Sequence, residues 1–300
     1  MGRSSAVSAL VVGEHGAPIT DVAVRQDARM LASASFDGTV LVWDLVEPAR
    51  ALPRAALLHR RLVSGVSWNP RHLDLLASSS ADKLVMVWDI NQTSRPLCVL
   101  GRHTEDINSV TWLPDGRRMV CVSEDGVASL WDALASRYLG DVASHASQCT
   151  GVSISDSGLI ATVGKDGGTT LSRVVEEASV LSLATRSYDE SIESCCWSRS
   201  GDRLAITTET GWVYVLDSAL GDVGAFWVSA SAARSVAWRD KDRELVVGDY
   251  DGRIHFLDSV TGRARAVHDN PQAWPRSLSC VGDVVAAGSM GSIPELLSVS

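Results

Sequence analysis

The fold of this chain is predicted by one stretch of its sequence, Ser33-Ala34-Ser35-Phe36-Asp37-Gly38-Thr39-Val40-Leu41-Val42-Trp43-Asp44. Apolar and polar residues alternate on both sides of Asp37-Gly38, which is the pattern of two half-buried strands. Asp-Gly is a preferred two-residue hairpin turn, because glycine accepts a positive φ angle without steric cost. The stretch therefore predicts a β-hairpin whose second strand ends in Trp-Asp.

This hairpin recurs along the chain. Two close copies are Ser80-Ala81-Asp82-Lys83 followed by Val87-Trp88-Asp89, and Ser123-Glu124-Asp125-Gly126 followed by Leu130-Trp131-Asp132. Looser copies occur at Lys165-Asp166-Gly167, Glu209-Thr210-Gly211, Tyr250-Asp251-Gly252 and Ser289-Met290-Gly291. The turn residues at 37, 82, 125, 166, 210, 251 and 290 are separated by 45, 43, 41, 44, 41 and 39 residues. A period of about 40 to 45 residues with a Trp-Asp signature indicates one propeller blade per repeat.

On these motifs the chain resembles the WD-repeat (WD40) family. The resemblance covers essentially the whole sequence, with three close repeats and four degenerate ones. It implies an all-β fold, a seven-bladed β-propeller of four-stranded antiparallel blades. Because seven repeats fill the length with little left over, we expect residues 1–300 to form a single domain. The resemblance is specific for the fold and weak for the function.

The seventh repeat has only three predicted strands, Arg276–Val281, Val284–Gly288 and Ile293–Ser298. The segment Ala6–Gly13 precedes the first repeat and has no blade of its own. Pairing it with Ile293–Ser298 completes the last blade and closes the ring, which removes an unpaired sheet edge. In the first blade we expect a short outer strand near Ala55–Leu58.

Composition restricts the partners and the compartment. The chain carries 36 acidic and 27 basic residues, a net charge of −9, and no basic run of the kind that nucleic-acid binders show. No apolar run approaches the roughly 18 residues of a membrane helix, and Ala6 fails the myristoylation motif, so we expect no targeting signal. Six cysteines without C-x-x-C spacing favour a reducing, cytoplasmic location. The expected partner is a protein or peptide, with no nucleic acid and no membrane.

Each of the three close repeats contains a histidine, a serine, an aspartate and a tryptophan at matching positions. The sets are His15, Ser35, Asp37 and Trp43; His59, Ser80, Asp82 and Trp88; and His103, Ser123, Asp125 and Trp131. Ser, His and Asp together suggest a hydrolase, but threefold repetition argues against catalysis because an active site is needed once. The family resemblance implies instead that these side chains bond one another and hold the blade together.

The sequence offers no convincing metal or cofactor site. Asp249-Tyr250-Asp251-Gly252 resembles the start of a calcium loop, but that loop needs glycine at its sixth position and glutamate at its twelfth, and the chain has Gly252 at the fourth and Val260 at the twelfth. Gly164-Lys165-Asp166-Gly167-Gly168 lacks phosphate-loop spacing. We therefore expect no cofactor, no metal and no catalytic residue.

The candidate binding residues come from the loops that face the central channel. At equivalent repeat positions, one arc carries aromatic and arginine side chains, namely Phe36, Arg234, Tyr250, Trp274 and Arg276. Such residues dominate protein–protein hot spots. The opposite arc carries carboxylates, namely Glu124, Glu193, Glu209 and Asp106. This pattern predicts a polarised face whose cationic and aromatic half binds an acidic or aromatic segment; the alternative is an ordinary solvated loop surface.

The predicted function is a non-catalytic scaffold that binds a protein or peptide on the channel-rim face. The alternative is an enzyme, or a propeller that binds a small ligand or metal in the central channel, with Glu193, Glu209 and the arginines as ligands. Propeller hydrolases usually gather several carboxylates or histidines at the channel mouth, whereas this rim has mixed charges.

Overall fold

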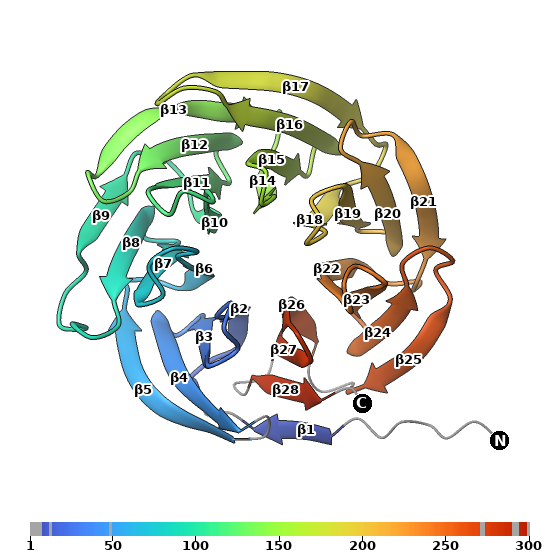
Figure 1. Cartoon of the computed structure of the whole chain (residues 1–300), viewed down its shortest axis with the longest axis horizontal. Coiled ribbons are helices and arrows are strands. Elements are labelled where there is room, and N and C mark those ends of the chain that lie inside the picture. Colours follow the sequence, from blue (N-terminus) through green and yellow to red (C-terminus); the bar gives the residue numbers. More distant parts are fainter. Residues whose placement is uncertain (1–7, 12–13, 48–49, 271–273, 290–293, 299–300) are drawn as a thin grey trace.

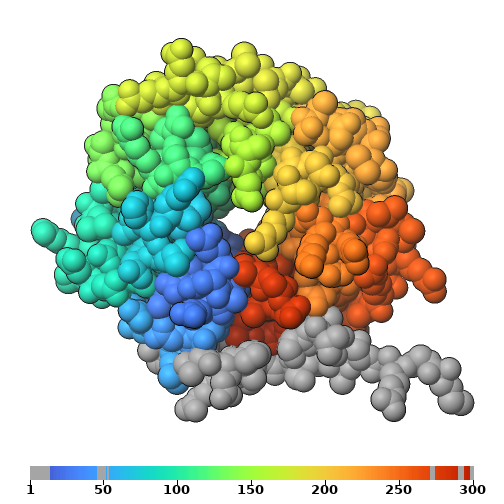
Figure 2. All heavy atoms as spheres, viewed as in Figure 1, coloured from blue at the N-terminus to red at the C-terminus, as the bar shows by residue number. Residues whose placement is uncertain are grey.

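The computed structural model describes residues 8–11, 14–47, 50–270, 274–289 and 294–298. Its strands form seven four-stranded antiparallel sheets arranged in a ring around a central channel (Figures 1 and 2). This arrangement confirms the predicted seven-bladed β-propeller. Among the described residues no helix has the length and apolar character needed to cross a membrane.

The first four blades follow one another along the chain. Blade 1 contains β2 (Ile19–Val24), β3 (Met30–Ser35), β4 (Thr39–Glu47) and β5 (Arg50–Leu58). Blade 2 contains β6 (Val63–Trp68), β7 (Leu75–Ser80), β8 (Leu84–Asp89) and β9 (Cys98–Gly101). Blade 3 contains β10 (Ile107–Trp112), β11 (Arg118–Ser123), β12 (Val127–Asp132) and β13 (Arg137–Ser144). Blade 4 contains β14 (Cys149–Ile154), β15 (Leu159–Gly164), β16 (Gly168–Val174) and β17 (Val180–Ser187).

The last three blades complete the ring. Blade 5 contains β18 (Ile192–Trp197), β19 (Arg203–Thr208), β20 (Trp212–Asp217) and β21 (Asp222–Trp227). Blade 6 contains β22 (Ala233–Arg239), β23 (Glu244–Asp249), β24 (Arg253–Asp258) and β25 (Ala264–Asp269). Blade 7 contains β26 (Pro275–Val281), β27 (Val284–Ser289), β28 (Glu295–Ser298) and, as its outermost strand, β1 (Ser8–Val11).

The predicted closure of the ring is confirmed for the described residues. Strand β1 pairs antiparallel with β28, with Ser8 opposite Ser298 and Val11 opposite Glu295. Figure 1 shows the first strand lying beside the last blade. The outer strand of blade 1 differs from the prediction, because β5 begins at Arg50 rather than near Ala55 and pairs with an equally extended β4.

Apolar contacts between neighbouring sheets hold the ring together. The cluster between blades 1 and 2 includes buried Val42, Val66 and Trp88, and similar clusters lie at the other blade interfaces. Three indole groups also bond across these interfaces: Trp68 Nε1 donates to Ala23 O (2.9 Å), and Trp112 and Trp238 make equivalent bonds. Each innermost strand is thereby fixed relative to the next, which sets the geometry of the channel.

Candidate functional site

The repeated polar side chains form a network inside each of the close repeats, and blade 2 shows it most fully. His59 Nδ1 lies 2.9 Å from Asp82 Oδ2, and His59 Nε2 lies 2.7 Å from Ser78 Oγ. Trp88 Nε1 donates to the same Ser78 oxygen at 2.8 Å. The side chains of His59, Trp88 and Ser78 are buried, so each polar atom depends on these partners. Both nitrogens of His59 are therefore engaged within its own blade.

The serine of this network is not the predicted one. Ser80 donates its hydroxyl hydrogen to Leu62 O (2.7 Å) and accepts a bond from Asp82 N (3.0 Å). It lies at the end of β7, beside the turn, whereas the rings of His59 and Trp88 reach two residues deeper, to Ser78. The same correction applies in blade 1, where Ser33 contacts His15 (2.8 Å) and Ser35 bonds to the carbonyls of the preceding loop.

Blade 3 replaces the network serine by a residue on the neighbouring strand. Cys121 occupies the position of Ser78, and Ser129, directly opposite it on β12, bonds to His103 Nε2 (2.7 Å) and to Trp131 Nε1 (2.9 Å). The predicted Ser123 instead donates to Glu105 O (3.3 Å).

The remaining members of the first and third networks lie as follows. In blade 1, Trp43 Nε1 donates to Ser33 at 3.4 Å, and His15 Nδ1 lies 3.4 Å from Asp37. In blade 3, His103 Nδ1 lies 2.9 Å from Asp125.

Blade 4 carries a further network that the sequence analysis did not assign. His145 contacts Asp166 (3.1 Å) and Thr162 Oγ1 (3.0 Å), so a threonine takes the place of the serine. The histidine at matching spacing was the signal that could have identified it.

The aspartates of these networks are held in their charged form. Burial by itself would raise the pKa of the Asp82 carboxyl, but hydrogen bonds from His59 and from backbone amides outweigh burial, and its pKa lies below the ordinary value. The same balance lowers the pKa of Asp37, Asp125 and Asp166. These charged groups are satisfied inside the blades, which is the arrangement of a structural network.

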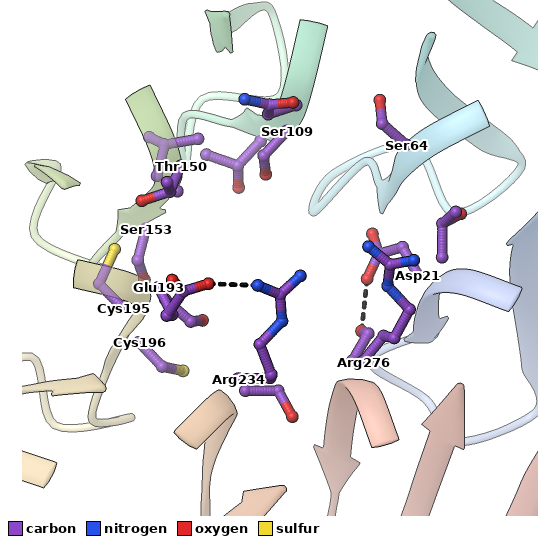
Figure 3. A pocket seen from close by; sticks show the side chains of 18 of the residues that line it. Asp21, Ser64, Ser109, Thr150, Ser153, Glu193, Cys195, Cys196, Arg234 and Arg276 are labelled. Atoms are coloured by element: carbon purple, nitrogen blue, oxygen red, sulfur yellow. Dashed lines mark hydrogen bonds and ion pairs between the residues drawn. The ribbon is translucent and has the colours of Figure 1, made fainter. Parts of the chain in front are cut away.

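The central channel contains a cavity of about 580 Å³, lined by hairpin-turn residues such as Phe36 and by innermost-strand residues such as Ile154. Six of the residues predicted on the two arcs line it: Phe36, Asp106, Glu124, Glu193, Arg234 and Arg276. In Figure 3, Arg234 extends toward Glu193, with which it is paired. Tyr250 and Trp274 lie in an adjoining hollow together with both arginines.

The cationic and aromatic arc is a set of stacked side chains. The Arg234 guanidinium lies 5.0 Å from the centre of the Tyr250 ring, and that ring lies 5.8 Å from the ring of Trp274. Arg276 lies 5.0 Å from the centre of the Phe36 ring. The three aromatic residues remain about 40 % exposed: Phe36 39 %, Tyr250 42 % and Trp274 41 %. The sequence columns thus identified residues that the structure brings together.

The charge of Arg234 affects the pKa of Arg276. Burial lowers the pKa of the Arg276 guanidinium, and the nearby charge of Arg234 lowers it further. Arg234 forms an ion pair with Glu193 at 2.5 Å, so this glutamate contacts the cationic arc rather than standing apart on the acidic one. Glu193 is largely buried and positions the guanidinium at the cavity wall.

The acidic arc is more dispersed than the cationic one. Burial raises the pKa of Glu124, and the neighbouring charge of Asp106 raises it further. Both residues line the cavity. Glu209 lies on an exposed turn and accepts a weak bond from Ser191 N at 3.4 Å.

The column of residues at the start of the innermost strands has two roles. In four blades its short polar side chains bond to a backbone carbonyl of the next blade: Thr20 to Val63, Ser64 to Ile107, Asn108 to Cys149 and Thr150 to Ile192. These residues join blades. In the other three blades the column holds Glu193, Arg234 and Arg276, whose long charged side chains line the cavity.

Asp21 is a cavity residue that sequence reasoning missed. Its carboxylate accepts bonds from Ser277 Oγ (2.5 Å), Val22 N (2.9 Å) and Val66 N (2.8 Å). Burial, the largest influence, raises its pKa to about 6 despite these bonds. Its signal was a single aspartate in a column that otherwise holds glycine or serine: Gly65, Ser109, Gly151, Ser194, Ser235 and Ser277.

Among the described residues, no group of three or more His, Cys, Asp or Glu side chains has the geometry to hold a metal ion. The residues at the cavity mouth are instead suited to bind a charged or aromatic side chain, because they combine guanidinium groups with exposed rings.

Comparison with known proteins defines the class of this closed, repeated fold. The family model described as "WD domain, G-beta repeat" matches residues 7–44, 57–89 and 94–132, and the model of the "Anaphase-promoting complex subunit 4 WD40 domain" matches residues 153–232. The chain belongs to the WD-repeat family of β-propellers.

Two curated proteins of Arabidopsis thaliana are similar to part of the chain. "Cell division cycle 20.6, cofactor of APC complex" is 23% identical over 166 residues, and "Cell division cycle 20.1, cofactor of APC complex" is 24% identical over 166 residues. Each alignment covers 52% of this chain, but only 39% and 36% of the respective relatives. The similarity therefore spans well under half of each relative.

Proposed function

We propose that this protein is a non-catalytic interaction scaffold that binds an acidic segment of a partner protein at the channel mouth. The binding residues are those of the cationic arc, defined as Phe36, Arg234, Tyr250, Trp274 and Arg276. The observation that carries this proposal is the placement of two guanidinium groups between three partly exposed aromatic rings at the edge of a cavity.

Electrostatics supports an anionic ligand. The pKa of Arg276 is lowered by burial and by Arg234, so the charged form of this side chain is less stable than in water. A carboxylate placed between the two arginines would relieve this repulsion and accept bonds from the planar donor forks. The neighbouring rings would contact apolar residues next to that carboxylate, as aromatic and arginine side chains do in interface hot spots.

The relatives support a protein partner. Both are named as cofactors of the APC complex, and such a name describes a protein that acts within an assembly. We extend to this chain only the general role of contacting another protein. The single ring of described strands supports treating residues 1–300 as one domain. The six free cysteines support a reducing compartment, which we propose is the cytoplasm.

A peptide titration tests the site. Fluorescence anisotropy would compare a dye-labelled Gly-Glu-Leu-Glu-Gly peptide with the same peptide in which Gln replaces Glu, using the full chain and the variant Trp274→Ala/Arg276→Ala. We expect the acidic peptide to bind the unaltered protein at least about tenfold more tightly than the Gln peptide, and this preference to disappear in the variant. Leu58→Ala, an exposed apolar residue of blade 1, is the matched control and should change nothing.

Thermal unfolding of each variant separates binding from stability. Equal binding of the two peptides, or unchanged binding by the double variant, would contradict the proposal. A fall of more than about 5 °C in the Tm of the double variant would assign Trp274 and Arg276 a structural role instead. Affinity capture from the native host, with the same variants, would then identify the partner.

A further inference from the structure

Blade 5 lacks the polar network of the first four blades. Tyr188 occupies the place of the histidine, because Tyr188 N donates to Gly167 O (3.0 Å) as His145 N donates to Gly126 O (2.8 Å). Buried Ile206 occupies the position of Ser78. The blade has therefore exchanged a hydrogen-bonded histidine for an aromatic side chain.

A row of four aromatic residues extends from this position to the surface. The Tyr188 ring lies 4.8 Å from the Tyr214 ring, and the Tyr214 ring stacks on Trp212 at 6.1 Å with an interplanar angle of 22°. Trp212 and Trp227 are directly opposite each other in β20 and β21, so both side chains leave the same face of the sheet. We call Tyr188, Tyr214, Trp212 and Trp227 the blade 5 row.

The outer half of the blade 5 row is exposed. Trp212 is 36 % and Trp227 58 % exposed, whereas Tyr188 and Tyr214 pack against the core cluster between blades 4 and 5. The row therefore has a fixed inner end and an accessible outer end. Figure 1 shows β17, which leads into Tyr188, reaching blade 5 at its outer strands. The four residues of the row lie in blade 5 and the loop before it, whereas the cationic arc is formed by blades 6, 7 and 1.

A carboxylate lies beside the row at Tyr214, next to the exposed Trp212. Glu190 accepts a hydrogen bond from the Tyr214 hydroxyl at 3.3 Å and another from the Thr210 hydroxyl, which fixes its carboxylate beside the row. Asp189 and Glu209 are exposed neighbours of these residues in sequence. The guanidinium that stacks on the row, Arg186 over Tyr188, is paired with Asp222 at 2.8 Å. Its charge is thereby offset, and the local balance is acidic.

We propose that the blade 5 row binds a basic segment of a partner protein. An arginine or lysine side chain of that segment would lie on the exposed indoles of Trp212 and Trp227, with its charge directed at Glu190. Tryptophan is the best aromatic partner for a cation, and a carboxylate at its edge strengthens the attraction. The surface has the opposite charge preference from the cationic arc, so the scaffold would contact two segments of different chemistry. This inference does not depend on the proposed function.

The test uses the full chain and a dye-labelled Gly-Arg-Leu-Arg-Gly peptide at about 0.15 M salt, a concentration at which diffuse surface attraction is strongly screened. The main variant is Trp212→Ala/Trp227→Ala, which leaves the net charge unchanged and so distinguishes a specific site from general attraction to an acidic protein. A second variant, Glu190→Gln, removes the carboxylate. Leu58→Ala is again the control for loss of an exposed apolar side chain.

We expect the double variant to weaken binding about tenfold or more and Glu190→Gln to weaken it about fivefold, with Leu58→Ala unchanged. The cationic-arc variant Trp274→Ala/Arg276→Ala should retain binding of the basic peptide, so the two proposals can fail separately. Equal binding by the double variant, or equal binding of a peptide with Gln in place of Arg, would overturn the inference. Concentration-dependent self-association lost in the double variant would assign the surface to a second copy of the chain instead.

Discussion

Ser277 donates a hydrogen bond to Asp21 at 2.5 Å and so joins the innermost strand of blade 7 to that of blade 1. The other carboxylate oxygen of Asp21 accepts a bond from Val66 N in blade 2. One carboxylate thus connects three consecutive blades at the wall of the channel.

The pKa of Asp21 makes stability depend on pH. Its folded-state pKa of about 6 lies above the ordinary value of 3.8, so between these values the folded protein binds more protons than the unfolded chain. The free energy of unfolding should therefore fall as pH rises through this window, by an amount of order 3 kcal/mol. Asp21→Asn removes the titrating group. Urea denaturation from pH 4 to 7 would measure the free energy of unfolding of the unaltered protein and of Asp21→Asn. The value for the unaltered protein should fall relative to that for the variant as pH rises. A difference between the two that does not change with pH would contradict the prediction.

The corrected network makes a prediction for the two serines of β7. Ser78→Ala leaves His59 Nε2 and Trp88 Nε1 buried without their partner and should reduce the free energy of unfolding by about 2 to 3 kcal/mol. Ser80→Ala should reduce it by about 1 kcal/mol, because Leu62 O keeps a second bond from Ala81 N. Chemical denaturation measures both. A larger loss of unfolding free energy for Ser80→Ala than for Ser78→Ala would show that Ser80, as the sequence suggested, is the more important serine.

Blade 3 offers an independent check of the same idea. Ser129 lies on a different strand from Ser78 but bonds to the equivalent histidine and tryptophan atoms. We expect Ser129→Ala to reduce the free energy of unfolding by a similar amount, about 2 to 3 kcal/mol. Ser123→Ala is the matched control. Little effect at Ser129, measured by the same denaturation experiment, would show that the network in this blade contributes little to stability.

Alanine substitutions at two glycines of blade 4 distinguish the cost of a steric clash from the cost of backbone strain. Gly167 and Gly158 both have a positive φ, 74° and 79°. A Cβ at Gly167 would lie 2.1 Å from Tyr188 O, whereas a Cβ at Gly158 would meet no atom within 4 Å. Gly158→Ala should therefore reduce the free energy of unfolding by about 1 kcal/mol and Gly167→Ala by at least about 3 kcal/mol. Thermal unfolding measures the stability of both variants. Equal losses of stability would contradict the close approach of Gly167 to Tyr188 O.

Ring closure can be tested by removing β1. Deletion of residues 1–11 leaves β28 without its outer neighbour and exposes an unpaired edge. We expect a large fall in Tm and association of the shortened chain, seen by circular dichroism and size-exclusion chromatography. Deletion of residues 1–7 keeps all four register pairs of β1 and is the control. A shortened chain that stays monomeric with an unchanged Tm would show that the last blade is stable with three strands.

The sequence was sufficient to predict the ring because the turn glycine and its spacing persist even in the degenerate repeats. It was not sufficient to choose between Ser78 and Ser80. Alternate residues of a strand face the same side, so Ser78 and Ser80 are equivalent in the sequence pattern. The pattern does not show which of the two the ring nitrogens of His59 and Trp88 contact. The length of β5 was also underestimated, because an outer strand with exposed side chains has a weak alternating pattern.

The cationic arc was predictable because equivalent positions of a repeat converge on one rim. Its internal pairing was not. The bond between Arg234 and Glu193 depends on the distance between blades 5 and 6, which no spacing in the sequence encodes. Asp21 was missed for the same reason, since its partners come from blades that are far apart in the chain.

The pairing of Ser8 with Ser298 has a consequence for how the protein is made. During translation β1 leaves the ribosome before every other described strand, and its partner β28 leaves after all of them. Blade 7 therefore cannot be completed until the other six blades have been synthesised. Until then an unpaired β1 and an incomplete ring are exposed to other chains, so slow, late closure is the step at which chaperones would protect this fold.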